Sequence, residues 1–147
     1  YGEIIDPNAD TPTLTFNTIG RHQSRLVNTR VASNKSPWLS GSEVGDIHTV
    51  AISHGEGRFV CPKELIGSLI ENGQIATQYV DSQNQPTMNI RYNPNGSLLA
   101  IEGITSPDGR VFGKMGHSER FSDNVYKNVD GIKDNGMFKN AVDYFKI

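Results

Sequence analysis

The sequence contains a single cysteine, Cys61, and has no apolar run long enough to cross a membrane. One cysteine cannot form an internal disulfide framework, and a membrane-spanning helix needs roughly 20 mostly apolar residues. Lysine and arginine are also too few and too scattered to form the basic stripe that a phosphate backbone requires. The composition therefore argues against a membrane protein and against nucleic acid as a partner, and it favours a cytoplasmic setting.

The 147 residues carry a formal net charge of -2 and fit one ordinary domain. No repeat and no low-complexity tract interrupts them. Short runs that alternate or are rich in β-branched residues, bounded by Gly, Pro, Asn and Asp, are typical of strands. They predict strands at 13–19, 24–31, 46–53, 75–80, 100–105 and 111–115. The Asp-Gly turn signal in SPDGR should join the last two of these as a hairpin.

Two segments have the apolar spacing of helices. Residues 62–72 (PKELIGSLIEN) begin with proline and stop before Gly73, which is the common order at helix ends. Residues 134–144 (DNGMFKNAVDY) predict a final helix. Its apolar side chains are expected to face inward: Met137, Phe138, Val142 and Phe145.

The stretch GKMGHSER places His117 and Glu119 two residues apart behind a short apolar strand. Residues at this spacing share a side of extended backbone but not of a helix. A carboxylate beside an imidazole fixes its tautomer, which is the base and its orienting partner in a nucleophilic triad. The alternative is a surface histidine with an incidental glutamate nearby.

The stretch SHGEGRF begins where a predicted strand ends, and glycines on both sides of Glu56 let backbone amides approach a bound group closely. A tight turn between strands is the structural alternative. A third interpretation is a metal-dependent hydrolase, because imidazoles and carboxylates suit zinc, iron or manganese. It would need at least three of four side chains to converge: His54, Glu56, His117 and Glu119.

Cys61 directly precedes Pro62 and lacks the glycine-rich strand-turn-helix setting that exposes a nucleophile. We therefore interpret it as a buried, inert thiol rather than as the partner of His117.

Longer blocks of the sequence, in order, resemble the glutaminase (class I glutamine amidotransferase) domain of phosphoribosylformylglycinamidine synthase. The blocks that carry this resemblance are GRHQSRLVNTRVASNKSPW, ISHGEGRF, GQIATQYVD, NPNGSLLAIEGITSPDGRVFGKMGHSER and FKNAVDYFK. They extend over most of the chain.

The resemblance implies a Cys, His, Glu triad in which His117 is the acid and base and Glu119 orients it. The family's nucleophile precedes this segment, so residues 1–147 are expected to be a C-terminal fragment without the nucleophile-bearing half. Many relatives read HPE where this chain has HSE, which keeps both functional side chains. The family's glutamine-binding segment falls on Ser53 and Gly55, with His54 and Glu56 as neighbours.

The resemblance also implies an α/β fold, the C-terminal half of a flavodoxin-like glutamine amidotransferase domain, strand-rich with antiparallel additions and few helices. The implied activity is release of ammonia from glutamine for ATP-dependent amidation of formylglycinamide ribonucleotide in de novo purine biosynthesis. The implied partner is a synthetase domain, which would bind ATP and Mg²⁺; no cofactor or metal is expected in this segment.

The alternative function is a noncatalytic binding module in which HGEG and GHSER are structural turns. The two functions differ in geometry, since catalysis requires His117 to lie near residues 53–56.

Overall fold

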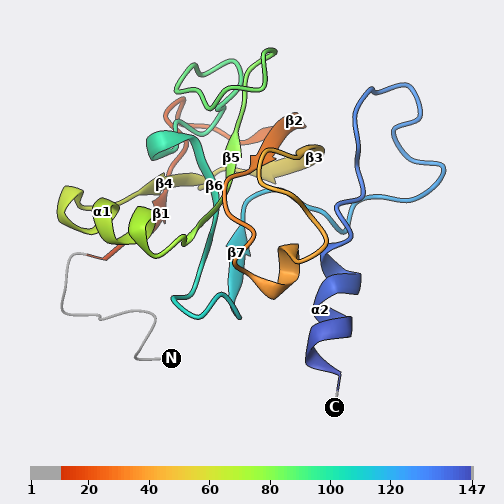
Figure 1. The fold of residues 1–147 in the computed structure, drawn as a ribbon. Helices are drawn as coiled ribbons and strands as arrows, with labels where there is room; N and C mark the ends of the chain where they lie inside the picture. Colours follow the sequence, from red (N-terminus) through yellow and green to blue (C-terminus); the bar gives the residue numbers. More distant parts are fainter. Residues whose placement is uncertain (1–10, 147) are drawn as a thin grey trace.

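The computed structural model describes residues 11–146, which form seven strands and two α-helices (Figure 1). Two short 3-10 helices, η1 (Pro37–Leu39) and η2 (Leu98–Ala100), lie between them. The helices are α1 (Lys63–Glu71) and α2 (Met137–Phe145). The strands are β1 (Thr13–Thr15), β2 (Gln23–Val31), β3 (Ile47–His54), β4 (Arg58–Val60), β5 (Ile75–Tyr79), β6 (Ile101–Thr105) and β7 (Phe112–Lys114).

Five strands form the main sheet in the order β3-β2-β5-β6-β7, and β1 pairs with β4 in a separate two-stranded sheet. Every one of these pairs is antiparallel. The main sheet curls so strongly that the chain after β7 reaches the free edge of β3. There the backbone N–H of His117 donates to the carbonyl of Ala51 over 2.8 Å. The two outer strands of the sheet therefore meet at His117.

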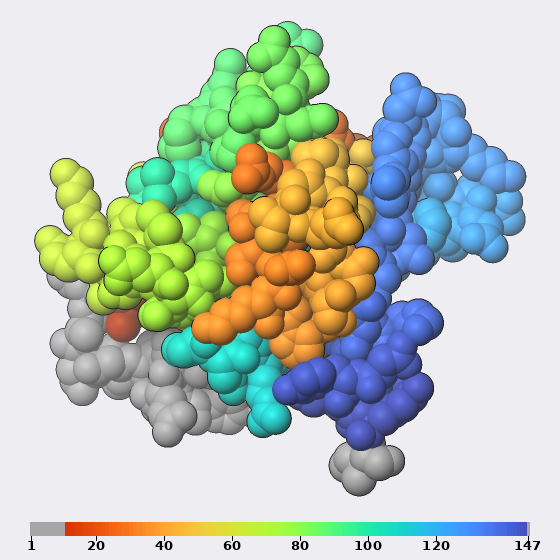
Figure 2. Space-filling model, in the orientation of Figure 1, coloured from red at the N-terminus to blue at the C-terminus, as the bar shows by residue number. Residues whose placement is uncertain are grey.

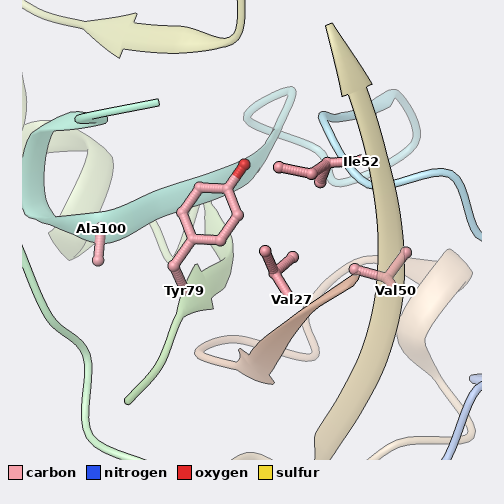
Figure 3. Close-up of a cluster of buried hydrophobic side chains, with 5 residues drawn as sticks. All are labelled: Val27, Val50, Ile52, Tyr79 and Ala100. Carbon is pink, nitrogen blue, oxygen red and sulfur yellow. The ribbon is translucent and has the colours of Figure 1, made fainter. Parts of the chain in front are cut away.

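The inside of this curl is filled by apolar side chains from β2, β3, β5 and η2 (Figure 3). Tyr79 is completely buried at its centre. The other members are Val27, Val50, Ile52 and Ala100. A second cluster attaches α1 and β4 to the sheet through Phe59, Leu69, Ile75 and Ile101. Burial of such side chains contributes about 1.5–3 kcal/mol each to the stability of the fold. The curled sheet is therefore stabilised by the apolar side chains inside it as well as by its strand pairs.

The predicted strand-rich fold with few helices is confirmed. The SPDGR hairpin is present, with Thr105 opposite Phe112. Helix α1 begins after Pro62, and Gly73 follows it with a φ of +65°. Neither helix within residues 11–146 has the length and apolarity needed to cross a membrane.

Three details differ from the sequence prediction. The strand predicted over 13–19 ends at Thr15, because the chain turns at Asn17 to bind another loop. Strand β4 was not predicted; three residues are too few for a visible period.

The final helix, α2, lies at the edge of the molecule (Figure 2), and of the four residues predicted to face inward it buries only Met137. Met137 and Ala141 are buried. The expected inward residues Phe138, Val142 and Phe145 are 50%, 60% and 44% exposed. Among the named elements, η1 is the main packing partner of the helix, and one narrow stripe suffices to cover that contact.

Candidate active site

His117 and Glu119 form a hydrogen-bonded pair just after β7. The distance between Nδ1 of His117 and Oε1 of Glu119 is 2.6 Å, and the two side chains are 30% and 58% exposed. A carboxylate can only accept a hydrogen bond, so Nδ1 carries the proton and Nε2 is left to exchange one with a substrate. This is the arrangement of a general base with its orienting carboxylate.

Glu119 keeps its negative charge at neutral pH. Partial desolvation alone would raise its pKa, but its own backbone amide, the hydrogen bond from His117 and the nearby Arg120 together lower the pKa of Glu119 below its usual value. Arg120 Nε lies 3.9 Å from Glu119 Oε1. The carboxylate is therefore available to stabilise an imidazolium.

The backbone places His117 beside the end of β3. Residues directly opposite in an antiparallel pair share a face, and so do alternate residues of one strand. His117 is opposite Ala51, so it lies on the same face as Ala51 and Ser53. The hydroxyl of Ser53 is 3.2 Å from Nε2 of His22. The structure thus brings the histidine to the point where the SHGEG loop begins.

The side chain of Asn17, which is 2% exposed, holds the SHGEG loop in place. Its Nδ2 donates to the carbonyl of His54 over 2.8 Å, and its Oδ1 accepts from the backbone N–H of Gly57 over 3.0 Å. The backbone N–H of Asn17 donates to the carbonyl of Gly55 over 2.9 Å. Among residues 11–146, nothing lies within 4 Å of the place that an added Cβ would take at Gly55, so space is open in front of this residue. The backbone of the loop is therefore fixed by Asn17 on one side, and it is accessible to a ligand at Gly55.

His54 points to the interior rather than toward His117. Its Nε2 is 2.9 Å from Oδ1 of Asn95, whose Nδ2 donates to the hydroxyl of Tyr79 over 2.8 Å. Desolvation lowers the pKa of His54, a hydrogen bond to Asn95 opposes this, and the charge of His117 lowers it further. The side chain is thus a neutral structural group behind the loop, and its buried Nδ1 has no hydrogen-bond partner in the part of the chain that the structure describes.

Glu56 is exposed at the tip of the loop. Within residues 11–146, no three His, Cys, Asp or Glu side chains lie close enough together to hold a metal ion. The convergence that the metal-dependent alternative requires does not occur in this part of the chain.

Cys61 follows β4, in the two-stranded sheet, whereas His117 lies at the meeting edges of the main sheet. Cys61 is partly buried and packs against the cluster that contains Phe59 and Leu69. Desolvation, and secondarily the charge of Glu64, raise the pKa of the Cys61 thiol. Both effects oppose formation of a thiolate.

Sequence reasoning did not identify three polar residues that shape the site: Asn17, Asn95 and Glu102. Each is at most 2% exposed and binds backbone or side chains from distant segments. The segment NPNGS, which contains Asn95, is part of a block that carries the family resemblance, but its pattern gives Asn95 no role of its own.

The chain belongs to the CobB/CobQ-like glutamine amidotransferase domain family, which it matches over residues 1–145. It is 36% identical over 126 residues to the phosphoribosylformylglycinamidine synthase subunit PurQ of Aquifex aeolicus, covering 86% of this chain and 53% of that one. Identity to the Methanosarcina barkeri subunit PurQ is 34% over 131 residues, covering 89% and 54%.

Among solved structures, the chain resembles one in PurLQS from Thermotoga maritima. The TM-score is 0.67 at 26% sequence identity, and the match covers 92% of this chain and 54% of that one. The chain spans about half the length of these relatives.

Proposed function

We propose that this chain supplies the histidine, its orienting glutamate and the glutamine-binding loop of a glutaminase site. The ammonia would serve ATP-dependent amidation of formylglycinamide ribonucleotide in purine biosynthesis. The observation that carries this proposal is the 2.6 Å contact between His117 and Glu119. It is supported by the position of His117 against Ala51, two residues before the loop begins.

The chemistry follows from which nitrogen of His117 is available. Nε2 of His117 takes the proton of a cysteine thiol, the resulting thiolate attacks the carboxamide carbon of glutamine, and Nε2–H then gives that proton to the departing nitrogen, so that ammonia leaves and a thioester forms. The same nitrogen then takes a proton from water, which hydrolyses the thioester to glutamate and frees the thiol. Glu119 stabilises the imidazolium in both steps.

The loop at residues 53–56 is suited to hold the α-amino and carboxylate groups of glutamine. Its backbone is anchored by Asn17, so little conformational entropy would be lost when the substrate binds. The open space at Gly55 leaves room for a ligand near the backbone. Ser53 adds a hydroxyl on the face that His117 shares.

The nucleophile is proposed to come from outside these 147 residues. Cys61 is the only cysteine of the chain, and its raised pKa and its place after β4 do not suit the role. In the protein expressed from its complete gene, Cys61→Ser should leave glutamate release within a few-fold of wild type. A glutamine-analogue affinity label should modify another cysteine. A labelled peptide that contains Cys61 would overturn this assignment.

The synthetase partner would bind ATP and Mg²⁺ and consume the ammonia. Support comes from the relative in Thermotoga maritima PurLQS and from the PurQ relatives, whose names describe a synthase subunit. A cytoplasmic location stays a prediction.

The direct test is glutamate release from glutamine by the protein expressed from its complete gene. His117→Ala should reduce this activity to background, while its thermal unfolding temperature stays close to that of wild type. Full activity in a folded His117→Ala variant would contradict the proposal and favour the noncatalytic interpretation.

A further inference from the structure

A carboxylate with no solvent exposure lies directly beneath the turn that carries His117. Oε1 of Glu102 accepts a hydrogen bond from the backbone N–H of Gly116 over 2.5 Å, and Oε2 accepts from the hydroxyl of Thr77. Both oxygens are therefore bound inside the protein, and one of them holds the residue just before His117.

Lys114 connects this carboxylate to the residue on the other side of His117. Its Nζ lies 3.7 Å from Oε1 of Glu102 and donates to the hydroxyl of Ser118 over 2.9 Å. Only 10% of the Lys114 side chain is exposed. Its ammonium thus balances the buried charge and fixes Ser118 at the same time.

The backbone must come very close to Glu102 for this arrangement to form. A Cβ at Gly116 would lie 2.7 Å from a methyl carbon of Val50 and 2.8 Å from Oε1 of Glu102, and both separations are too short for a side chain. The glycine therefore lets the carboxylate reach the amide directly.

A buried ion pair is not the most stable way to fill a position on a central strand such as β6. Well-packed apolar residues of similar volume are often as stabilising or more so, because two charges must be desolvated to form the pair. The use of Glu102 and Lys114 here is explained by what they bind on the two sides of one imidazole. Glu102 binds the backbone N–H of Gly116 before it, and Lys114 binds the side-chain hydroxyl of Ser118 after it.

We propose that Glu102 and Lys114 are positioning residues that fix the orientation of His117 for proton transfer. Glu102 fixes the backbone before the histidine, and Lys114 fixes the serine after it. This inference rests on the proposed glutaminase function and deepens it, because it assigns roles to two residues that do not touch glutamine.

The test uses Lys114→Met in the protein expressed from its complete gene. Loss of the Ser118 contact should lower kcat for glutamate release on the order of tenfold to a hundredfold, since small misplacements of a catalytic group have effects of that size. KM should stay within about twofold, because the substrate loop at residues 53–56 is unchanged. The matched control is Lys139→Met, which removes an exposed lysine that pairs with Asp143 on α2 and should keep wild-type kcat.

A second variant separates positioning from folding. Lys114→Met leaves the Glu102 charge unpaired, whereas the double variant Glu102→Gln with Lys114→Met removes both charges and keeps similar shapes. Its thermal unfolding temperature should approach that of wild type while kcat stays low. Lys114→Arg, which restores a cationic donor, should recover most of kcat.

The outcomes also separate this inference from the proposed function. If wild type releases no glutamate, the glutaminase proposal fails, and the positioning claim is then decided by ¹⁵N-histidine NMR. In that spectrum Lys114→Met should shift or broaden the His117 imidazole signals, and unchanged signals would contradict the claim. If wild type is active but the folded double variant keeps wild-type kcat, the positioning role is wrong while the glutaminase proposal stands.

Discussion

At His117 one ring nitrogen is bound and the other is available. Nδ1 is occupied by Glu119, and the backbone is tied to Ala51. The spacing of two residues achieves this without any distant partner, because the chain turns directly after His117, where the backbone N–H of Arg120 donates to the carbonyl of His117 over 3.2 Å. The pair is consequently assembled within residues 117–119, although its usefulness depends on the sheet edge beneath it.

Glu119→Gln should lower kcat without abolishing binding of glutamine. The side-chain amide of the substituted residue 119 can donate as well as accept, so it no longer dictates which nitrogen of His117 carries the proton. It also has no charge with which to stabilise an imidazolium. We expect a decrease of at least roughly tenfold in glutamate release, by analogy with loss of the orienting carboxylate in other triads. A steady-state assay with His117→Ala as the lower limit measures it, and wild-type kcat would contradict the orienting role.

His54 makes stability dependent on pH. Its pKa is lowered in the folded protein, chiefly by burial, from the ordinary value of 6.5. The unfolded chain therefore binds more protons than the folded one below about pH 6.5, and stability decreases as the pH falls through that region. His48, which is half-buried and whose pKa is also lowered, chiefly by desolvation, contributes in the same direction.

His54→Gln should therefore flatten the pH dependence without removing it. The free energy of unfolding, measured with denaturant between about pH 5 and pH 7.5, should fall less steeply toward acid than in wild type. The slope that remains belongs to His48 and the carboxylates. An identical slope in both proteins would show that His54 does not titrate differently in the folded state.

The SHGEG loop, between β3 and β4, contains two glycines with different surroundings. A Cβ at Gly57 would lie 2.1 Å from Cδ2 of His54, whereas one at Gly55 would meet nothing within 4 Å. The imidazole of His54 therefore lies directly on Gly57, and only a residue without a side chain fits there.

Gly57→Ala should destabilise the protein by about 1–3 kcal/mol, the usual cost of overpacking. Gly55→Ala is the matched control and should change the free energy of unfolding by much less. Denaturant titration of both variants measures the difference. Equal stability of the two variants would show that the His54 ring moves away without cost.

Most elements of the fold could be predicted from sequence because their patterns are local. Alternation marked β2, β3 and β5, and proline and glycine marked the ends of α1. The missing parts depend on tertiary contacts. Strand β4 forms only because β1 pairs with it, and the buried face of α2 is chosen by η1.

The candidate site likewise contains residues that could be selected from the sequence and residues that only the tertiary structure reveals. For His117 and Glu119, the spacing alone left open a surface histidine with an incidental glutamate, and the family resemblance of the surrounding blocks selected the pair. The sequence does not reveal Glu102, because a glutamate in an apolar strand has no pattern of its own. Its role depends on Gly116, which follows β7 and brings its backbone N–H to the carboxylate.

At the scale of the whole molecule, the chain that follows β7 meets the edge of β3. This contact brings together the two parts of the proposed site, which are His117 and the loop at residues 53–56. Residues 51 and 117 are far apart in sequence, and one backbone hydrogen bond links them. Damage to this region should therefore affect glutamine chemistry while leaving a separate synthetase site intact.

In the complex of the complete protein with its synthetase partner, His117→Ala should abolish amidation driven by glutamine. Amidation driven by added ammonium should persist at close to the wild-type rate, because the synthetase reaction does not need the imidazole. Parallel assays of product formation with the two nitrogen sources measure this. Equal loss of both reactions would mean that the substitution disrupts folding or docking, and the role of His117 would have to be withdrawn.

The anchoring of the substrate loop by the side chain of Asn17 requires that one of its two terminal atoms is a nitrogen, which can donate hydrogen bonds. Its Nδ2 donates to the carbonyls of Arg21 and His54, while Oδ1 receives the N–H of Gly57. Deamidation of Asn17 to aspartate would keep the shape of the side chain but replace Nδ2 by a carboxylate oxygen. This oxygen cannot donate, and its negative charge would face two carbonyl oxygens that are themselves acceptors. Slow deamidation of Asn17 would then remove the hydrogen bonds that anchor the loop, although shape and packing stay intact. A protein preparation would therefore lose affinity for its substrate on storage while remaining folded.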